Sequence, residues 1–202
     1  MVREQNILDV PLIAQMPELP RGCEVTSLAM LLAYAGVEAD KLTLAGEIRK
    51  SRIPYEKKNG DTYFGDPNEG FVGSMTDFRS PGLGVYHKPI AELASRYLGT
   101  RIVDLTGSDF SLVEHQIERC RPVWVINNEW FRPLPQRYFR TWFTENGPLD
   151  ITYKEHSVVV TGFDDQFVYF NDPLRPQKNR RTPKQKFIAG WQQLFSQAVS
   201  FR

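Results

Sequence analysis

Residues 23–35 form an apolar segment, CEVTSLAMLLAYA, that contains neither Gly nor Pro. Pro20 and Gly22 come just before it and disfavour a helix, and Gly36 follows it directly. Its apolar positions recur at the intervals of a helix: Val25, Leu28, Ala29 and Leu32. The pattern predicts a helix that begins at or just before the first residue of this segment and ends near Gly36. This helix is apolar enough to be largely buried, so other segments must cover it.

Four more segments have helical patterns. Thr43 is a candidate N-cap for a short helix that runs to about Arg52. Two amphipathic helices follow around residues 90–97 and 110–120, and residues 187–195 form a closing helix. Their inward faces consist of apolar residues at helical spacing: Ile90, Leu93, Ala94 and Tyr97, then Phe110, Val113, Ile117 and Cys120, and finally Phe187, Trp191 and Leu194. Most of the predicted helices therefore lie in the first part of the chain.

Strand-like patterns begin after Pro122. Residues 122–127 (PVWVIN) are a candidate buried strand. Two hairpins follow, with residues 140–144 and 149–153 around the turn ENGP, and residues 156–163 and 166–170 around the turn DDQ. Because helices come first and antiparallel strands second, the sequence predicts an α+β fold with N-terminal helices packed on a C-terminal antiparallel sheet. At 202 residues the chain fits a single domain, residues 1–202.

Residues 53–86 are rich in Gly, Pro, Asn and Asp, which predicts a long loop. Loops of this length in compact domains commonly form lids or walls of binding sites. We therefore expect four of its aromatic residues to form one wall of a substrate cleft, opposite Trp130 and Phe131. These four are Tyr63, Phe64, Phe71 and Phe78. The alternative is that the aromatic side chains fix the loop to the core.

The charge of the chain bears on its partners. With 25 basic and 24 acidic residues the formal net charge is +1, so nothing favours nucleic acid as the main partner. The basic stretch 178–186 (KNRRTPKQK) is expected to be a solvated loop before the last helix. No stretch of roughly 18 apolar residues could insert into a membrane, and residues 1–10 lack the apolar region of a signal peptide. We expect a soluble monomer, cytoplasmic as written, or secreted or at the cell envelope if the chain is a trimmed mature domain.

The two cysteines, Cys23 and Cys120, fit neither a disulfide scaffold nor a multi-cysteine zinc site. The three histidines include no pair at the spacing of metal ligands on a helix. We therefore expect no metal and no other cofactor. Cys120 is predicted to be a core residue on the last turn of its helix, not bonded to Cys23.

Cys23 is the strongest candidate for chemistry because of its place at a helix N-terminus. The positive end of the helix dipole favours the thiolate, which is the nucleophilic form of cysteine in covalent catalysis. We expect its pKa to lie below that of a free cysteine, and a nearby imidazolium would lower it further. The other interpretation is a structural cysteine buried in an apolar helix.

His156 is the candidate base. It opens a strand-like run, where an imidazole can project from a rigid sheet into a cleft. A histidine in a strand can also be a structural group with satisfied hydrogen bonds. The contexts of the other two are weaker, since His87 lies in the loop before Pro89 and His115 lies on a helix away from its apolar face.

Asp172 and Gln15 complete the candidate site. Asp172 follows the strand 166–170, and an adjacent antiparallel strand can return its end beside His156. A carboxylate there would fix the imidazole tautomer and stabilise the imidazolium. The sequence NDP is also an ordinary turn, and the two aspartates of the second hairpin turn are competing candidates. Gln15 could form an oxyanion hole together with the backbone N–H of Cys23.

Three blocks of the sequence, QMPELPRGCEVTSLAMLLAYAG, EHSVVVTGFDD and VYFNDP, resemble the catalytic blocks of the C39-like peptidases, also called the YvpB-like group. The resemblance extends over most of the chain and includes GDPNEGFVGS, GLGVYHKPI, RPVWVIN and AGWQQLFSQAV. The 133 residues from Cys23 to His156 also fall within the roughly 130–150 seen in papain-like enzymes. The resemblance implies a papain-like cysteine peptidase that hydrolyses a peptide or protein substrate through an acyl-enzyme. In it, Cys23 is the nucleophile, His156 the base, Asp172 the orienting group and Gln15 the oxyanion helper.

Two features depart from the family pattern. Gln15 lies eight residues before Cys23, which is wider than is typical of papain-like enzymes, and a bulged Pro loop would absorb the extra length. Bacteriocin-processing relatives are fused to a membrane transporter that this sequence lacks, so cleavage of a double-glycine leader does not carry over. Two alternatives stay open. One is a cysteine amidase or acyltransferase acting on cell-wall peptides, and the other is a non-catalytic papain-like binding module.

Overall fold

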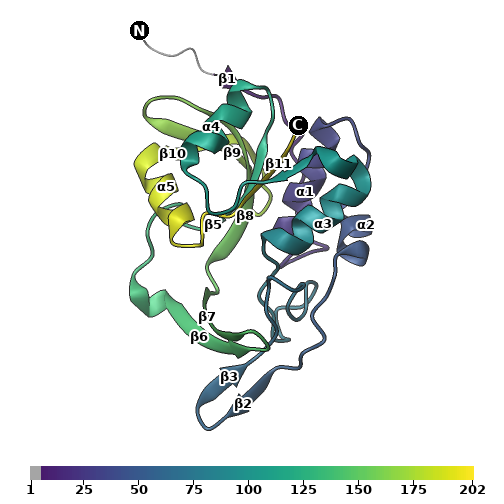
Figure 1. Cartoon of the computed structure of the whole chain (residues 1–202), viewed down its shortest axis with the longest axis vertical. Coiled ribbons are helices and arrows are strands. Elements are labelled where there is room, and N and C mark those ends of the chain that lie inside the picture. The colour runs from purple at the N-terminus through teal and green to yellow at the C-terminus, as the bar shows by residue number, and fades with distance from the viewer. Residues whose placement is uncertain (1–5) are drawn as a thin grey trace.

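The computed structural model describes residues 6–202 and shows a large sheet with helices on both faces and a smaller sheet at one end (Figure 1). The α-helices are α1 (Cys23–Tyr34), α2 (Lys41–Glu47), α3 (His87–Leu98), α4 (Phe110–Glu118) and α5 (Lys184–Gln192). Two short 3-10 helices, η1 (Gly99–Arg101) and η2 (Gln136–Tyr138), precede strands. No helix in residues 6–202 has the length and apolar character needed to cross a bilayer.

The large sheet is antiparallel throughout. Its strands are β1 (Asn6–Ile7), β4 (Ile102–Asp104), β5 (Val123–Asn128), β8 (Glu155–Phe163), β9 (Phe167–Asp172), β10 (Gln177–Pro183) and β11 (Ala198–Phe201). They run in the order β10-β9-β8-β5-β11-β4, and β1 also pairs with β8. The predicted strands that became β5 and β8 therefore lie side by side at its centre.

The smaller sheet has the order β2-β3-β6-β7. Its strands are β2 (Glu56–Lys58), β3 (Asp61–Tyr63), β6 (Phe139–Thr144) and β7 (Gly147–Thr152). β6 and β7 are the first predicted hairpin, whereas β2 and β3 lie inside the segment that we expected to be a continuous loop. Within the described residues, β3 pairs with β6 in parallel, and the other pairs of this sheet are antiparallel.

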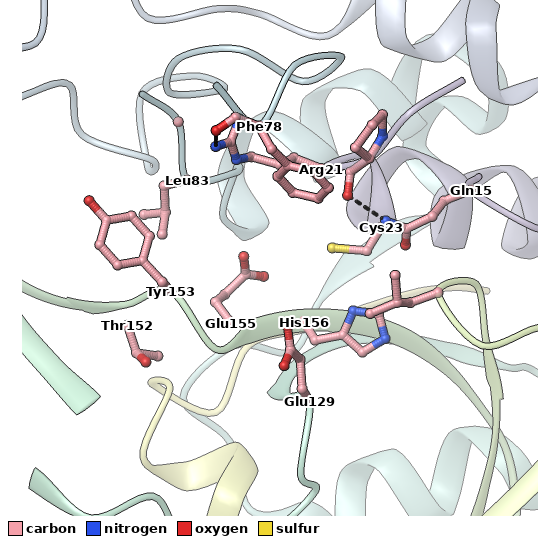
Figure 2. A pocket seen from close by; sticks show the side chains of 13 residues that line it. Gln15, Arg21, Cys23, Phe78, Leu83, Glu129, Thr152, Tyr153, Glu155 and His156 are labelled. Carbon is pink, nitrogen blue, oxygen red and sulfur yellow. Dashed lines mark hydrogen bonds between the residues drawn. The ribbon is translucent and has the colours of Figure 1, made fainter. Parts of the chain in front are cut away.

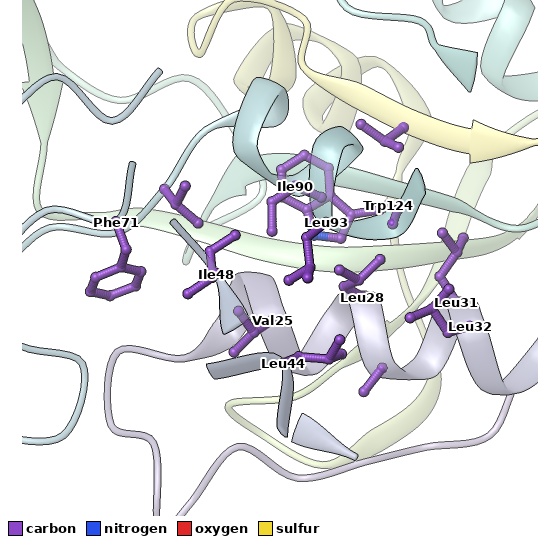
Figure 3. Close-up of a cluster of buried hydrophobic side chains, with 14 of the residues drawn as sticks. Val25, Leu28, Leu31, Leu32, Leu44, Ile48, Phe71, Ile90, Leu93 and Trp124 are labelled. Carbon is purple, nitrogen blue, oxygen red and sulfur yellow. The ribbon is translucent and has the colours of Figure 1, made fainter. Parts of the chain in front are cut away.

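The core lies on both faces of the large sheet. Trp124 and Ile126 of β5 pack with α1, α2 and α3, and the alternate residues Val123 and Val125 pack with α4 and α5. Figure 3 shows the first of these clusters, where α1 is covered by side chains from several other segments. Because β5 is covered on both faces, all of its residues are buried, as the sequence predicts. The α+β class with helices against an antiparallel sheet is confirmed.

Several predicted boundaries are wrong in detail. The second helix begins after Asp40, whose carboxylate accepts hydrogen bonds from the amides of Leu42 and Thr43, and it ends at Glu47. Asp40 rather than Thr43 is therefore the cap. The basic stretch 178–186 is not a loop, because most of it forms the edge strand β10 and the start of α5. The strand β11 has no counterpart in the prediction.

Cys120 is not a core residue. It lies beyond the end of α4 at a backbone φ of 57°, and its side chain is exposed. The left-handed conformation at this position turns the chain away from the helix axis. The prediction that the two thiols are unpaired is confirmed, since both cysteines are free.

Candidate active site

Cys23 is the first residue of α1, at the point where a tight loop enters the helix. The loop closes through a hydrogen bond from the amide of Gly22 to the carbonyl of Leu19, at 2.9 Å. A Cβ atom on Gly22 would lie 2.4 Å from the Cβ of Leu19, so only glycine fits this approach. The thiol of Cys23 therefore stands at the helix N-terminus, as predicted, with 7% of the residue exposed.

His156 and Asp172 come together through strand pairing. They lie on the neighbouring strands β8 and β9, which are antiparallel with Val159 opposite Asn171. The imidazole Nε2 of His156 is 2.8 Å from Asp172 Oδ1, and both side chains are buried. The structure thus brings these two predicted residues into direct contact through Nε2 of the imidazole.

The carboxylate of Asp172 is held by more than His156. Its Oδ1 accepts hydrogen bonds from the amides of Leu174 and Arg175 at 3.0 and 3.2 Å, and Oδ2 accepts one from the guanidinium of Arg180 at 2.7 Å. Burial favours the neutral acid, but the hydrogen bond and charge of His156, then the amide of Arg175 and the guanidinium of Arg180, outweigh it. The pKa of Asp172 therefore lies below its ordinary value, and the group is an anion near neutral pH.

Arg180 was missed by the sequence reasoning. It lies on β10, the edge strand next to β9, and its guanidinium also stacks 4.8 Å from the centre of the Phe131 ring. Residues 177–183 (QKNRRTP) show no apolar alternation, so no local pattern in the sequence marks them as an edge strand that returns a cation to Asp172.

A cleft of about 180 Å³ is shared by Gln15, Cys23 and His156 (Figure 2). The Cys23 sulfur points toward Glu155 on one side of it, the imidazole of His156 lies on the other side, and Tyr153 lies beyond Glu155. Asp172 lies behind His156 and lines an adjoining hollow rather than this cleft. Three of the four predicted residues therefore line one cleft, and the fourth supports the histidine from outside it.

Gln15 is 2% exposed, and its side-chain Nε2 donates to the carbonyl of Pro20 at 2.9 Å. Its backbone amide donates to the carbonyl of Pro173 at 2.9 Å, which fixes it to the residue that follows Asp172. A hydrogen bond of 3.0 Å from the amide of Leu19 to the carbonyl of Gln15 folds the intervening residues into a turn. This turn takes up the extra residues between Gln15 and the thiol.

The Cys23 thiol donates a hydrogen bond to Oε2 of Glu24 at 3.3 Å, and within residues 6–202 it has none to His156. Glu24 is fully buried, and its Oε1 accepts from the amide of Val85 at 2.8 Å. Glu155 lies nearby with its Oε1 buried and without a hydrogen-bond partner in the described chain. Two carboxyl groups thus lie beside the thiol that sequence reasoning did not consider.

These carboxyl groups overturn our prediction for the thiol. Burial, and then the negative charges of Glu24 and Glu155, raise the pKa of Cys23 well above its ordinary value, although we expected the helix dipole to lower it. Burial also raises the pKa of Glu24 to about 7, and burial together with Glu24 and Glu129 raises the pKa of Glu155. In the resting state the thiol is therefore neutral and held on Glu24.

The wall of the cleft contains one of the four predicted aromatic residues. Phe78 lines the cleft and is 61% exposed, whereas Phe64 and Phe71 belong to the core. Tyr63 stacks on Phe143 of the small sheet, with ring centres 5.3 Å apart. The alternative interpretation, that the aromatic residues fix the loop to the core, is thus correct for Phe64 and Phe71.

Arg21 explains how the loop reaches the cleft. Its guanidinium donates to the carbonyls of Ser74, Asp77 and Ser80 at 2.9, 2.6 and 3.0 Å. The same group stacks 4.9 Å from the centre of the Phe78 ring. Because Arg21 lies two residues before Cys23, these contacts hold residues 74–80 of the loop beside the segment that carries the thiol.

The expected opposite wall is wrong. Phe131 is buried behind His156, with ring centres 6.0 Å apart, and Trp130 lines a separate outer hollow. The cleft is instead lined by Thr152, Tyr153 and Glu129, where we expected Trp130 and Phe131.

The other two histidines lie elsewhere. His87 begins α3, rather than lying in a loop, and its Nδ1 is 2.6 Å from Asp104 Oδ2. His115 is on the exposed side of α4. In residues 6–202, one group of three potential metal ligands lies close together: Cys23, Glu24 and Glu155, with ligand atoms within 4.8 Å of one another.

The raised pKa of Glu24 predicts a pH-dependent stability. The folded protein binds the proton of the Glu24 carboxyl more tightly than the unfolded chain does. The contribution of this proton to the free energy of unfolding is therefore fully present below about pH 4.5 and is lost as pH rises through about 7. Wild-type protein should lose up to roughly 3 kcal/mol of unfolding free energy over this range relative to Glu24→Gln. Urea unfolding at several pH values measures the difference, with the exposed Glu38→Gln as control. A difference that does not vary with pH would contradict the assignment.

Comparison with known proteins agrees with this geometry. The sequence profile of the Peptidase_C39 like family matches residues 7–199. The uncharacterized protein YvpB of Bacillus subtilis (strain 168) is 50% identical over 194 residues, which cover 95% of this chain and 74% of YvpB. A crystal structure from Bacillus anthracis, provisionally described as a C39-like peptidase, matches with a TM-score of 0.91 and 44% identity, covering 98% of each chain. The chain belongs to the Peptidase_C39 like family.

Proposed function

We propose that the protein is a cysteine peptidase that hydrolyses peptide bonds through Cys23, His156 and Asp172. The observation that carries this proposal is the buried hydrogen bond of 2.8 Å between His156 Nε2 and Asp172 Oδ1. It fixes the ring so that Nδ1 is left for the cleft that Cys23 also lines. A nucleophile, a base and a group that orients the base are the parts that covalent acyl transfer needs.

The reaction begins when the Cys23 side chain turns from Glu24 toward His156. The thiol proton passes to Nδ1 of His156, and the sulfur attacks the carbonyl carbon of the scissile peptide bond. The carbonyl oxygen becomes an oxyanion, which accepts hydrogen bonds from the backbone N–H of Cys23 and from Gln15 Nε2. The N–H of the first helical residue is available because it has no partner within the helix.

The intermediate collapses when His156 returns its proton to the leaving nitrogen. The carbon–nitrogen bond breaks, the amine product leaves, and a thioester remains on Cys23. A water molecule then gives a proton to His156 and attacks the thioester carbon. The carbon–sulfur bond breaks, the acid product leaves, and the thiol is restored.

Asp172 stabilises the imidazolium that forms in each half of this cycle. Arg180 and the two backbone amides keep the carboxylate ionised and fixed, so it does not take the proton from His156. Glu24 has the opposite influence, since it holds the resting thiol in its neutral form. The thiolate of Cys23 therefore forms only after its side chain rotates away from Glu24 and toward His156.

The test is incubation of the wild-type protein with an unbiased peptide library in ¹⁸O-labelled water, followed by mass spectrometry. Hydrolysis gives fragments whose new carboxyl terminus carries one ¹⁸O. Transfer of the acyl group to an amine gives products without the label and would support an acyltransferase instead. If the library yields neither kind of product, the peptidase proposal fails and a binding module replaces it.

A further inference from the structure

A second hollow begins at His156 and leads away from Cys23. Its inner part, about 360 Å³, is lined by His156, Asp172, Arg175 and Arg180, together with Glu129 and Leu174. Its outer part, about 340 Å³, is lined by Arg132, Arg175, Arg180 and Lys186 and by Glu129. Because the two parts share Glu129, Arg175 and Arg180, they adjoin each other, and we name them together the basic groove.

The charges of the basic groove are not balanced. Arg180 forms an ion pair with Asp172. The carboxylate of Glu129 forms an ion pair with Lys154, with Oε2 and Nζ 3.1 Å apart. The three remaining cations are exposed and have no ion pair within the described part of the chain: Arg132, Arg175 and Lys186. Grouped cations repel one another, so the groove favours an anion from solution.

The basic stretch 178–186 divides at this groove. Lys178 pairs with Asp9 and Lys184 pairs with Glu114, so these two cations are used within the fold. Lys186 instead lines the groove. Arg181 lies outside the groove, over the Phe167 ring, so Arg180 and Lys186 are the cations of this stretch that line it.

The proposed mechanism sets the direction of the groove. His156 must give its proton to the leaving nitrogen, so the part of the substrate after the scissile bond has to lie on the His156 side. The basic groove begins at His156 and extends on that side. Glu24 and Glu155 lie beside the thiol, and Glu155 lines the cleft.

We propose that the basic groove binds a carboxylate carried by the part of the substrate that follows the scissile bond. This carboxylate is an acidic side chain or the terminal carboxylate of a short peptide. Arg175 and Lys186 supply the charge, and the inference rests on the proposed peptidase function. It assigns a substrate class to the enzyme, namely peptides that are anionic after the cleaved bond.

The experiment compares matched peptides derived from one that the wild-type protein cleaves. They differ only after the scissile bond, with Glu or Gln as side chain, and with a free or an amidated terminus. We expect kcat/KM to be about five- to tenfold higher for the acidic member of at least one pair. The kcat/KM values of the two members should become more alike as the salt concentration is raised. The side-chain pair and the terminus pair show which source of carboxylate is bound.

Arg175→Gln and Lys186→Gln should each lower the acidic-to-neutral ratio about two- to fivefold. Lys88→Gln, which removes an exposed cation on α3 away from the groove, should leave the ratio unchanged. Equal cleavage of acidic and neutral peptides by wild type would overturn the groove assignment and leave the peptidase proposal standing. Failure to cleave any peptide would overturn the peptidase proposal itself. Retention of a single-stranded oligonucleotide that Lys186→Gln weakens, without any peptide preference, would replace the carboxylate by nucleic acid.

Discussion

Cys23→Ala should reduce peptide cleavage about 10⁵-fold or more while the protein stays folded. The substitution removes the sulfur that forms the acyl-enzyme, and neither His156 nor Gln15 can replace it as a nucleophile. Cys23 belongs to none of the three hydrophobic clusters, so truncation at the cleft leaves the core packing in place. Initial rates measure the loss, and near-UV circular dichroism with thermal unfolding measures the fold.

The chain offers a matched control in its other thiol. Cys120 is free, exposed and beyond the end of α4, and Cys120→Ala should keep full activity. If both variants lost activity equally, the loss would come from handling of the protein rather than from the nucleophile. Wild-type rates in Cys23→Ala would contradict the proposed mechanism.

His156→Ala should lower kcat/KM about 10³- to 10⁵-fold, because both proton transfers pass through the imidazole. The variant also leaves Asp172 buried without one of its partners, which lowers stability. His156→Gln separates the two effects, since its amide can donate to Asp172 but cannot carry the proton. Both variants should be comparably inactive, whereas His156→Gln should recover part of the lost thermal stability.

His87→Ala is the control for this prediction. It removes a partly exposed contact between a histidine and an aspartate, with His87 Nδ1 2.6 Å from Asp104 Oδ2, outside the cleft. Its kcat/KM should match that of the wild type. Should His156→Gln keep rates within tenfold of wild type, His156 would be a structural residue and the base would have to be sought elsewhere.

Local rules predict much of this fold. The prolines and Gly22 before residue 23 set the start of α1, which is observed at Cys23. The two hairpins follow from their turn sequences, and the second of them brings His156 to Asp172. Wherever an apolar period and a turn residue agreed, the predicted element is present in the structure.

The electrostatics of the cleft could not be predicted in the same way. The helix dipole is a local property of the sequence, but the carboxyl of Glu155 comes from a strand far from Cys23 in the chain. The effect of burial likewise depends on what covers the thiol. Burial of the thiol and the charges of Glu24 and Glu155 raise the pKa of Cys23, which is opposite to the direction that the helix dipole predicts.

The strands β10 and β11 were missed for a related reason. β10 has no buried period to reveal it, so its residues read as a loop although Arg180 binds Asp172. β11 is short, and its four buried residues follow a helix without a long turn. Both strands depend on pairing with partners that lie elsewhere in the sequence.

The position of β11 affects how the protein must assemble. β4 joins the large sheet only through β11, and β11 pairs with β5 on its other side. Both neighbours come much earlier in the sequence, so each has an unpaired backbone edge until the last strand inserts. Such open edges can recruit strands from other molecules. Weakening of β11 would therefore appear first as aggregation during refolding or synthesis, before any change at the cleft.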